Sequence, residues 1–172
     1  EAASGSDYLI LAVPSVFTRS TAKSMAPYIK EGQVIVCVAK GIEETTLMTL
    51  TDIVAQEIPA AEIAVMCGPS HAEEVGIGLP TTVVAGAKKK HIAEGVQDIF
   101  MNQVFRVYTS PDVLGMELGG ALKNVIALAA GMADGLGYGD NTKAALITRG
   151  ILEIGRLALK MGASYETLSG LT

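Results

Sequence analysis

Hydrophobic residues in the first 110 positions gather in short apolar runs, separated by longer stretches with apolar residues at helical spacing. The runs cover residues 8–13, 33–38, 63–66, 81–85 and 104–108, and the helical stretches cover about 15–29, 46–58 and 91–101. Strands that are apolar throughout are buried on both faces, which is typical of a parallel sheet covered by helices. The alternation therefore predicts an α/β fold with a parallel sheet over residues 1–110.

The pattern changes after Ser110-Pro111, where apolar residues follow helical spacing for the rest of the chain. Residues 112–136 and 141–161 predict two long helices joined by a glycine-containing turn. We therefore place a domain boundary near residues 109–111, with a sheet domain over 1–110 and the start of an all-helical domain over 111–172.

A glycine signature is missing from the sheet half. A dinucleotide-binding sheet opens with a strand and a G-x-G-x-x-G turn, whose helix N-terminus holds a pyrophosphate. No such turn follows any predicted strand, and Gly115 to Gly120 lie inside a helical pattern. Either the fold does not bind dinucleotides or the chain begins after that turn. Because residues 8–13 resemble an interior strand, we expect the second.

Composition narrows the class of protein. The net charge of -5 argues against nucleic acid as a partner, because nucleic acid requires a basic surface. Cys37 and Cys67 lie in or at the end of apolar runs, which favours buried, reduced thiols over a disulfide framework. No stretch reads as long and apolar enough to cross a bilayer, and no signal peptide is evident at the start. We expect a cytoplasmic protein without a membrane span.

Candidate ligand-binding residues follow two predicted strands, at the sheet edge where open α/β folds bind ligands. Lys40 comes directly after the run 33–38, and Phe17 lies just beyond the run 8–13. Lys40 is equally explained as a surface lysine in a turn, and Phe17 as a core aromatic. No Cys/His/Asp cluster has the spacing of a metal site, so we expect no metal.

The turn Gly68-Pro69-Ser70 separates an apolar run from a predicted helix start. Ser70 and Glu73 have the spacing of a capping box, in which each side chain bonds to the backbone at the helix start. Backbone N–H groups at the same helix start could instead face a ligand beside the sheet. The two roles are compatible, and we expect both.

Lys123 is the strongest candidate for chemistry. It lies within the predicted helix 112–136, with Gly119, Gly120 and Ala127 as its neighbours on the helix surface. Small neighbours leave room for a substrate to approach. Burial, together with a second cation such as Lys40, would lower the lysine pKa and allow proton exchange near neutral pH. A lysine that extends along the helix edge into solvent explains the pattern equally well.

Taken in chain order, several motifs resemble the bacterial-type NAD(P)-dependent glycerol-3-phosphate dehydrogenases. They are LAVPS at 11–15, AKGIE at 39–43, GPSHAEEV at 68–75, FRVYTSPD at 105–112, ELGGALKN at 117–124 with its continuation to 130, and GLGYGDNTKAAL at 135–146. The resemblance covers nearly the whole chain, and its motifs are long and in order.

The resemblance implies the later part of a Rossmann-like domain over 1–110, without its glycine fingerprint. The first helices of an all-α domain, of the 6-phosphogluconate dehydrogenase C-terminal type, would follow over 111–172. It implies reversible reduction of dihydroxyacetone phosphate to sn-glycerol 3-phosphate with NAD or NADP as cofactor, for glycerophospholipid synthesis, by a homodimer. Because family segments at both ends are missing, we expect the chain to be a truncated and nearly inactive piece.

The resemblance also implies roles for individual residues. Lys123 would be the general acid and base of the reaction. The residues expected to bind substrate are Lys40, Gly68, Ser70, Lys123 and Asn124, and those expected to bind cofactor are Lys40, Ala72 and Phe17.

Two alternative functions remain open at this point. One is a related reductase with the same two-domain plan, such as a β-hydroxyacid dehydrogenase or a ketopantoate reductase, although the Gly-Pro-Ser turn and the Leu-Lys-Asn run fit the first family better. The other is a helical assembly module that keeps an enzyme scaffold without catalysis.

Overall fold

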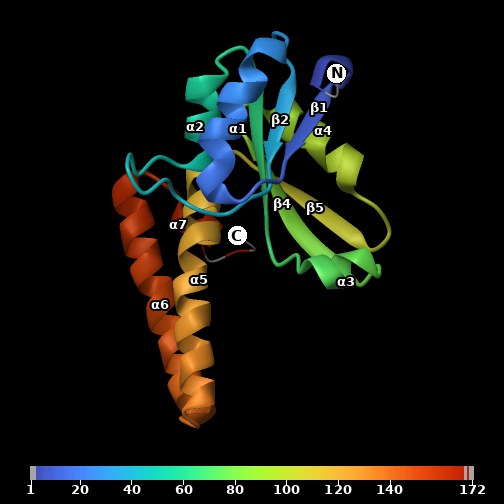
Figure 1. Cartoon of the computed structure of the whole chain (residues 1–172). Helices are drawn as coiled ribbons and strands as arrows, with labels where there is room; N and C mark the ends of the chain where they lie inside the picture. The colour runs from blue at the N-terminus through green and yellow to red at the C-terminus, as the bar shows by residue number, and fades with distance from the viewer. Residues whose placement is uncertain (1–2, 169, 171–172) are drawn as a thin grey trace.

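The computed structural model describes residues 3–168 and 170, which form a five-stranded sheet flanked by helices and a pair of long helices extending from it (Figure 1). The strands are β1 (Tyr8–Leu11), β2 (Val34–Cys37), β3 (Glu62–Cys67), β4 (Thr81–Ala87) and β5 (Phe105–Ser110). The helices are α1 (Thr18–Met25), α2 (Leu50–Glu57), α3 (Ala72–Gly76), α4 (Lys90–Phe100), α5 (Val113–Gly135), α6 (Gly139–Met161) and α7 (Tyr165–Leu168). Short 3-10 turns cover Ala3–Gly5, Ser15–Phe17 and Ala26–Tyr28. The predicted α/β fold is confirmed.

The sheet follows the chain order β1-β2-β3-β4-β5, and it is not wholly parallel. β1, β2 and β3 run parallel, as do β4 and β5, but β3 and β4 are antiparallel. The prediction of an all-parallel sheet is therefore wrong at one junction. The connection there holds only α3, whose five residues span about 7 Å. The parallel connections hold longer helices, with eight residues in α2 and eleven in α4, as is usual for a parallel crossover.

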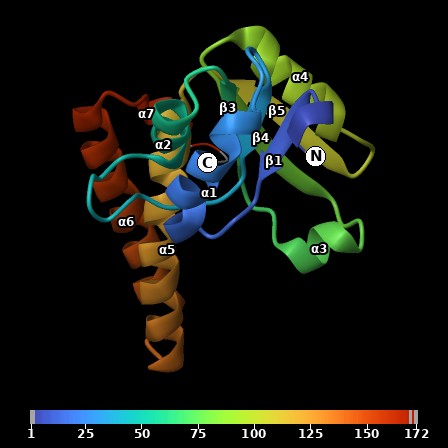
Figure 2. The same ribbon diagram turned by 45° about the horizontal axis from the view of Figure 1, so that its top comes forward.

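Alternate residues of strand β2 pack into two separate hydrophobic cores, because successive side chains of a strand point to opposite faces of the sheet. Val34 and Val36 pack with helix α4, whereas Ile35 and Cys37 pack with residues of α1 and α2. Figure 2 shows α4 on one side of the sheet and α1 and α2 on the other. Burial on both faces explains why these strands read as continuous apolar runs.

The first turns of helix α5 pack against the sheet, and its far end extends away from the sheet (Figure 1). Met116 is fully buried and packs with Val65, Cys67 and Val84 at its start. Gly86 makes this contact possible, because a Cβ there would lie 2.4 Å from the Met116 sulfur. Further along, α5 lies beside α6, and Leu118 packs among residues of α6 and α7. The predicted division near residue 110 stays a prediction, because α5 contributes to the packing of both parts.

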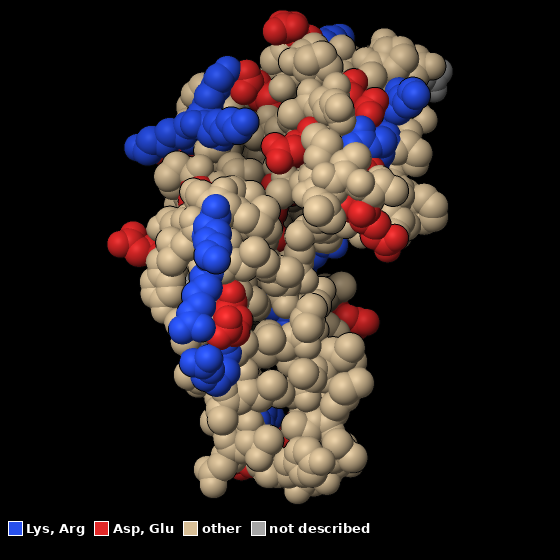
Figure 3. All heavy atoms as spheres, turned by 90° about the vertical axis from the view of Figure 1, so that its left-hand side faces the viewer, with Lys and Arg blue, Asp and Glu red and all other residues tan. Residues whose placement is uncertain are grey.

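Helix α5 is long and apolar enough to cross a bilayer, contrary to the expectation from the sequence. Its 23 residues and mean hydropathy of 1.4 over an 18-residue window meet the length and composition of a span, so the statement that no stretch does is wrong. Val125, Leu128 and Met132 are exposed apolar residues of α5, and Leu136 at its C-cap is exposed as well. Figure 3 shows few charged groups near the far end of the helical pair. Residues 115–120, in the first turns of α5, are buried, whereas 28% of the 18-residue window as a whole is buried.

Replacing Met116 tests how strongly α5 is anchored. Met116→Ala should lower the free energy of unfolding by about 2–5 kcal/mol, because it leaves a cavity between helix and sheet. Met116→Leu conserves volume and should cost less than about 1.5 kcal/mol. Urea unfolding of the purified variants gives both values. An alanine variant as stable as the parent would show that the helix does not depend on this contact.

Candidate functional site

The carboxyl ends of β1, β2 and β3 meet at one edge of the sheet, because these three strands are parallel. The loops that follow β1 and β2 are in close contact there. A Cβ on Gly41, whose φ is 153°, would lie 2.7 Å from the Cβ of Ser15. Glycine is therefore required at this position, and the contact brings the loop of Lys40 beside the turn that carries Phe17.

Helix α5 closes one side of this edge. A Cβ on Gly120 would lie 2.8 Å from the Cys67 sulfur and 3.5 Å from Cγ of Lys40. The helix backbone therefore packs directly on the Cys67 side chain at the end of β3, with no room for a side chain on the helix at this position. This close approach brings the next turn of α5 over the loops that follow β2 and β3.

A cavity of about 330 Å³ lies between α5 and these loops. The residues that line it are Lys40, Cys67, Gly68, Pro69, Gly120, Lys123, Asn124 and Gly170. The Lys40 ammonium donates a hydrogen bond of 3.4 Å to the Gly68 carbonyl. Among the described residues that line the cavity none is acidic, so its two ammonium groups favour an anionic or carbonyl ligand.

Burial changes the pKa of two groups in the cavity. It lowers the pKa of Lys123, because a half-buried ammonium loses part of its hydration. It raises the pKa of the Cys67 thiol, an effect opposed by the nearby Lys40 and Lys123. The thiol therefore stays neutral, and the cavity keeps a positive charge beside an amine that releases its proton more readily than an ordinary lysine.

The structure brings together four of the seven residues singled out from the sequence: Lys40, Gly68, Lys123 and Asn124. Ser70 and Ala72 instead line a separate, mostly apolar cavity of about 510 Å³, together with Ile10 and Met66. Phe17 lies beyond the end of β1 with 57 % of its surface exposed and lines neither cavity.

The predicted capping box at Ser70 is wrong. Helix α3 begins at Ala72, so its N-cap residue is His71 rather than Ser70. The Ser70 hydroxyl donates to the Gly68 carbonyl at 3.4 Å, and Glu73 lies 3.2 Å from the His71 ring. The helix starts one residue too late for the spacing of a capping box, and the N-cap residue makes no side-chain cap hydrogen bond.

An arginine that the sequence did not reveal braces the Lys40 loop. Arg19 on α1 donates two hydrogen bonds of 2.7 Å to the Glu43 carboxylate and one of 2.6 Å to Glu57 on α2. The bond with Arg19 is the main cause that lowers the pKa of Glu43 to about 2. Glu43 and Glu57 lie 24 and 38 positions from Arg19 in the sequence, so no local sequence pattern predicts these bonds.

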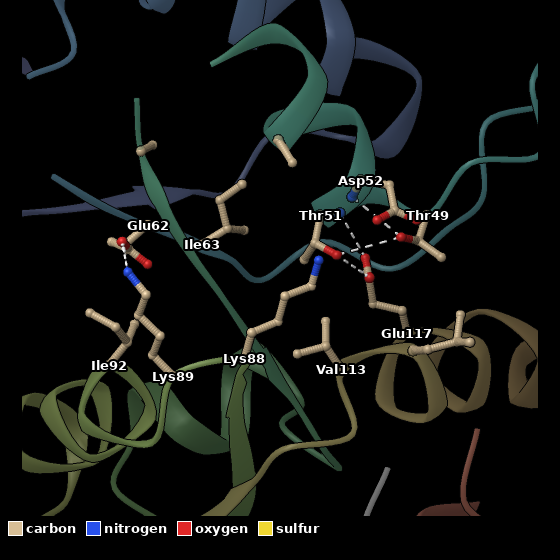
Figure 4. A pocket seen from close by; sticks show the side chains of 13 residues that line it. Thr49, Thr51, Asp52, Glu62, Ile63, Lys88, Lys89, Ile92, Val113 and Glu117 are labelled. Carbon is tan, nitrogen blue, oxygen red and sulfur yellow. Dashed lines mark hydrogen bonds and ion pairs between the residues drawn. The ribbon is translucent and has the colours of Figure 1, made fainter. Parts of the chain in front are cut away.

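Glu117 is a second functional candidate that the sequence analysis did not single out. Its carboxylate is buried between α5 and α2, where it accepts a 2.9 Å hydrogen bond from the Thr51 backbone (Figure 4). Burial is the main cause of its raised pKa. A single acidic residue on the buried face of an apolar helix was the available signal. Within residues 3–168 and 170, no cluster of His, Cys, Asp and Glu could hold a metal ion.

Two family models match most of the chain. Residues 1–93 match the N-terminus of NAD-dependent glycerol-3-phosphate dehydrogenase, and residues 112–172 match its C-terminus. The chain belongs to the NAD-dependent glycerol-3-phosphate dehydrogenase family. The resemblance seen in the motifs is thereby confirmed.

Individual relatives agree with this membership. A glycerol-3-phosphate dehydrogenase (NAD(P)+) from Agathobacter rectalis is 77% identical over 172 residues, which are 100% of this chain and 51% of that protein. The chain thus spans about half the length of the curated relatives it matches. The crystal structure of glycerol-3-phosphate dehydrogenase from Coxiella burnetii has a TM-score of 0.92 and 38% identity, over 97% of this chain and 51% of that one.

The alternative reductase is related at the level of fold. A ketopantoate reductase from Ralstonia eutropha has a TM-score of 0.64 and 21% identity, over 95% of this chain and 55% of that one. This likeness shows a shared fold only. The family assignment rests on the two family models.

Gly120→Ala tests the close approach of α5 to β3. The added Cβ has to displace the Cys67 sulfur, so we expect a loss of about 1–3 kcal/mol in the free energy of unfolding. Gly120→Ala combined with Cys67→Ala should recover part of this loss, since the obstructing atom is gone. Urea unfolding of both singles and the double variant measures the coupling.

Gly131 on the same helix provides the matched control, because a Cβ there would meet nothing within 4 Å. Gly131→Ala should stabilise the protein by about 1 kcal/mol through helix propensity. If Gly120→Ala stabilised the protein to the same extent, the helix would not pack against β3 as described.

Proposed function

We propose that this chain forms the substrate-binding and proton-transfer part of an enzyme that reduces dihydroxyacetone phosphate to sn-glycerol 3-phosphate, reversibly, with NADH or NADPH. The main support is the cavity in which Lys123, Lys40 and Asn124 meet beside the Gly68 turn. Two ammonium groups in a cleft without described acidic residues suit a small phosphorylated ketone. The names of the relatives supply the substrate and the cofactor.

Residues present in the chain fit the nicotinamide end of the cofactor. Open α/β sheets bind dinucleotides at their carboxyl edge. At this edge Phe17 presents an exposed aromatic ring, and Ser70 and Ala72 are exposed beside the Gly68 turn. When bound, the reduced cofactor supplies a hydride. We assign Phe17, Lys40 and Ala72 to the cofactor, and Lys40, Gly68, Ser70 and Asn124 to the substrate.

Lys123 carries the proton chemistry in this proposal. During reduction its ammonium donates a proton to the carbonyl oxygen, which would otherwise become an alkoxide. During oxidation the neutral amine takes that proton back. Because burial lowers the pKa of Lys123, its neutral amine forms at a lower pH than that of an ordinary lysine, which favours proton transfer in both directions. The Lys40 ammonium and the Asn124 amide donate to substrate oxygens and so hold the carbonyl near Lys123.

The remaining parts of the proposal concern the complete enzyme. We propose that it acts in the cytoplasm as a homodimer, and that its product enters glycerophospholipid synthesis. Because the chain spans about half of its relatives and carries no glycine-rich pyrophosphate turn, we expect the 172 residues alone to be nearly inactive.

Lys123→Met in the complete enzyme should lower kcat by about 10²–10⁴-fold, the usual contribution of a positioned acid or base. Steady-state oxidation of NADH with dihydroxyacetone phosphate measures it, and circular dichroism checks the fold. Lys90→Met is the matched control, because the Lys90 side chain is 85% exposed on α4. Equal rates for the two variants would overturn the proposal, and full activity on a ketone without phosphate would favour another reductase.

The pH dependence should differ between the two directions. Reduction needs the protonated amine, so its kcat/KM should fall as the pH rises through the pKa of Lys123. Because burial lowers that pKa, the fall should occur below the ordinary lysine value of about 10.4. Oxidation needs the neutral amine and should rise over the same interval. A reduction profile that stays flat up to that ordinary value would argue against Lys123 as the acid.

A further inference from the structure

Glu117 lies outside the cavity that holds Lys123, yet it is the one charged residue among the buried residues of the described chain, with 7% of its surface exposed. Oε1 accepts a hydrogen bond of 2.9 Å from the Thr51 backbone N–H, and Oε2 accepts one from the Thr51 hydroxyl. Figure 4 shows the Glu117 side chain of α5 directed at Thr51 in the first turn of α2. A buried carboxylate is costly unless it is hydrogen-bonded in this way.

Glu117 accepts its hydrogen bond from the Thr51 N–H, a group that has no partner within helix α2 itself. The first N–H groups of α2 have no partner within the helix. The Thr49 side chain caps the helix by accepting from the Asp52 N–H at 3.4 Å, which leaves the Thr51 N–H for another acceptor. Glu117 supplies that acceptor from 66 positions away. The positive end of the helix dipole favours a carboxylate there.

Glu117 lies on the same helix as Lys123, about two turns before it. Gly120, three residues on, touches Cys67 and Lys40. Lys123, six residues on, reaches the cavity, so its Cα lies about 9 Å further along the helix axis than that of Glu117. Two contacts at successive turns, Glu117 with α2 and Gly120 with β3, fix both the rotation and the axial position of the helix.

Other charged groups surround the same contact without replacing it. Asp52 and Lys88 line a cavity of about 230 Å³ beside the carboxylate, and Glu62 and Lys89 form an ion pair on its far wall. Thr51 donates to the Glu117 carboxylate through both its backbone N–H and its hydroxyl, and a side-chain hydrogen bond with Thr49 also acts on the pKa of Glu117. The geometry of the carboxylate therefore depends on the first turn of α2 and its N-cap residue.

We propose that Glu117 is a positioning residue for the reaction. Its bonds to Thr51 hold α5 in the register at which the Lys123 amine faces Lys40 and Gly68 across the cavity. This inference rests on the function proposed for Lys123. A residue that contributed stability alone would leave the turnover of the folded enzyme unchanged.

Three substitutions in the complete enzyme separate these roles. Glu117→Ala removes the acceptor, and Glu117→Asp withdraws it by one methylene, so that α5 must shift or lose the bonds. Both should lower kcat by roughly 10–100-fold, the usual effect of displacing a catalytic group by about 1 Å. Glu117→Gln keeps an acceptor for the Thr51 N–H and should retain activity within about 5-fold of the parent.

The readouts are kcat and KM for dihydroxyacetone phosphate, the dissociation constant of NADH, and Tm. NADH affinity should remain within about 3-fold of the parent in every variant, because the sheet domain is unchanged. Glu62→Gln is the matched control: it neutralises a carboxylate on the same cavity, away from α5, and should leave kcat unchanged.

The outcomes distinguish the possibilities. Loss of kcat in the alanine and aspartate variants, with rescue by glutamine, supports the proposal. A lower Tm with unchanged kcat in those two variants overturns it. If the alanine variant does not fold, the aspartate and glutamine variants decide in the same way. An unmodified enzyme that does not reduce dihydroxyacetone phosphate would refute the proposed function itself, a result visible before any variant is made.

Discussion

The close packing of helix α5 against the carboxyl end of β3 determines most of what this fold can do. At Gly120 the helix backbone packs directly on the Cys67 side chain at the end of the strand, and Met116 fills the space one turn earlier. Because interiors are packed at high density, a helix seated this tightly has one position rather than a range. The cavity beyond Gly120 exists because the helix continues past the sheet edge.

The packing of α5 contributes both to stability and to the placement of the residues proposed for the chemistry. Met116, which anchors α5 to the sheet, and Glu117, which bonds to α2, lie on the turns just before Lys123. On the opposite side of the cavity, Arg19 braces the loop that carries Lys40 through its bonds to Glu43 and Glu57. Two amines that repel each other are thus held beside one cavity by contacts outside it. Preorganisation of this kind avoids reorganisation during reaction.

The sequence predicted the elements well because their period is local: apolar runs mark β1 to β5, and helical spacing marks α5 and α6. Lys123 could be found because it interrupts an apolar helix among small residues. The antiparallel junction of β3 and β4 depends on the length of a connecting helix, and the Glu117–Thr51 contact joins residues 66 positions apart. Such features are set by packing in three dimensions, which a local pattern does not record.

We propose above all that ligand chemistry takes place in the cavity between α5 and the ends of β2 and β3. A crystal structure of the complete enzyme with glycerol 3-phosphate and oxidised cofactor tests it most directly. The secondary hydroxyl oxygen should lie about 2.7–3.2 Å from the Lys123 nitrogen, with Lys40 and the Gly68 turn around the rest of the molecule. Glycerol 3-phosphate bound in the apolar cavity against Ile10 and Met66, with its secondary hydroxyl remote from Lys123, would contradict the account.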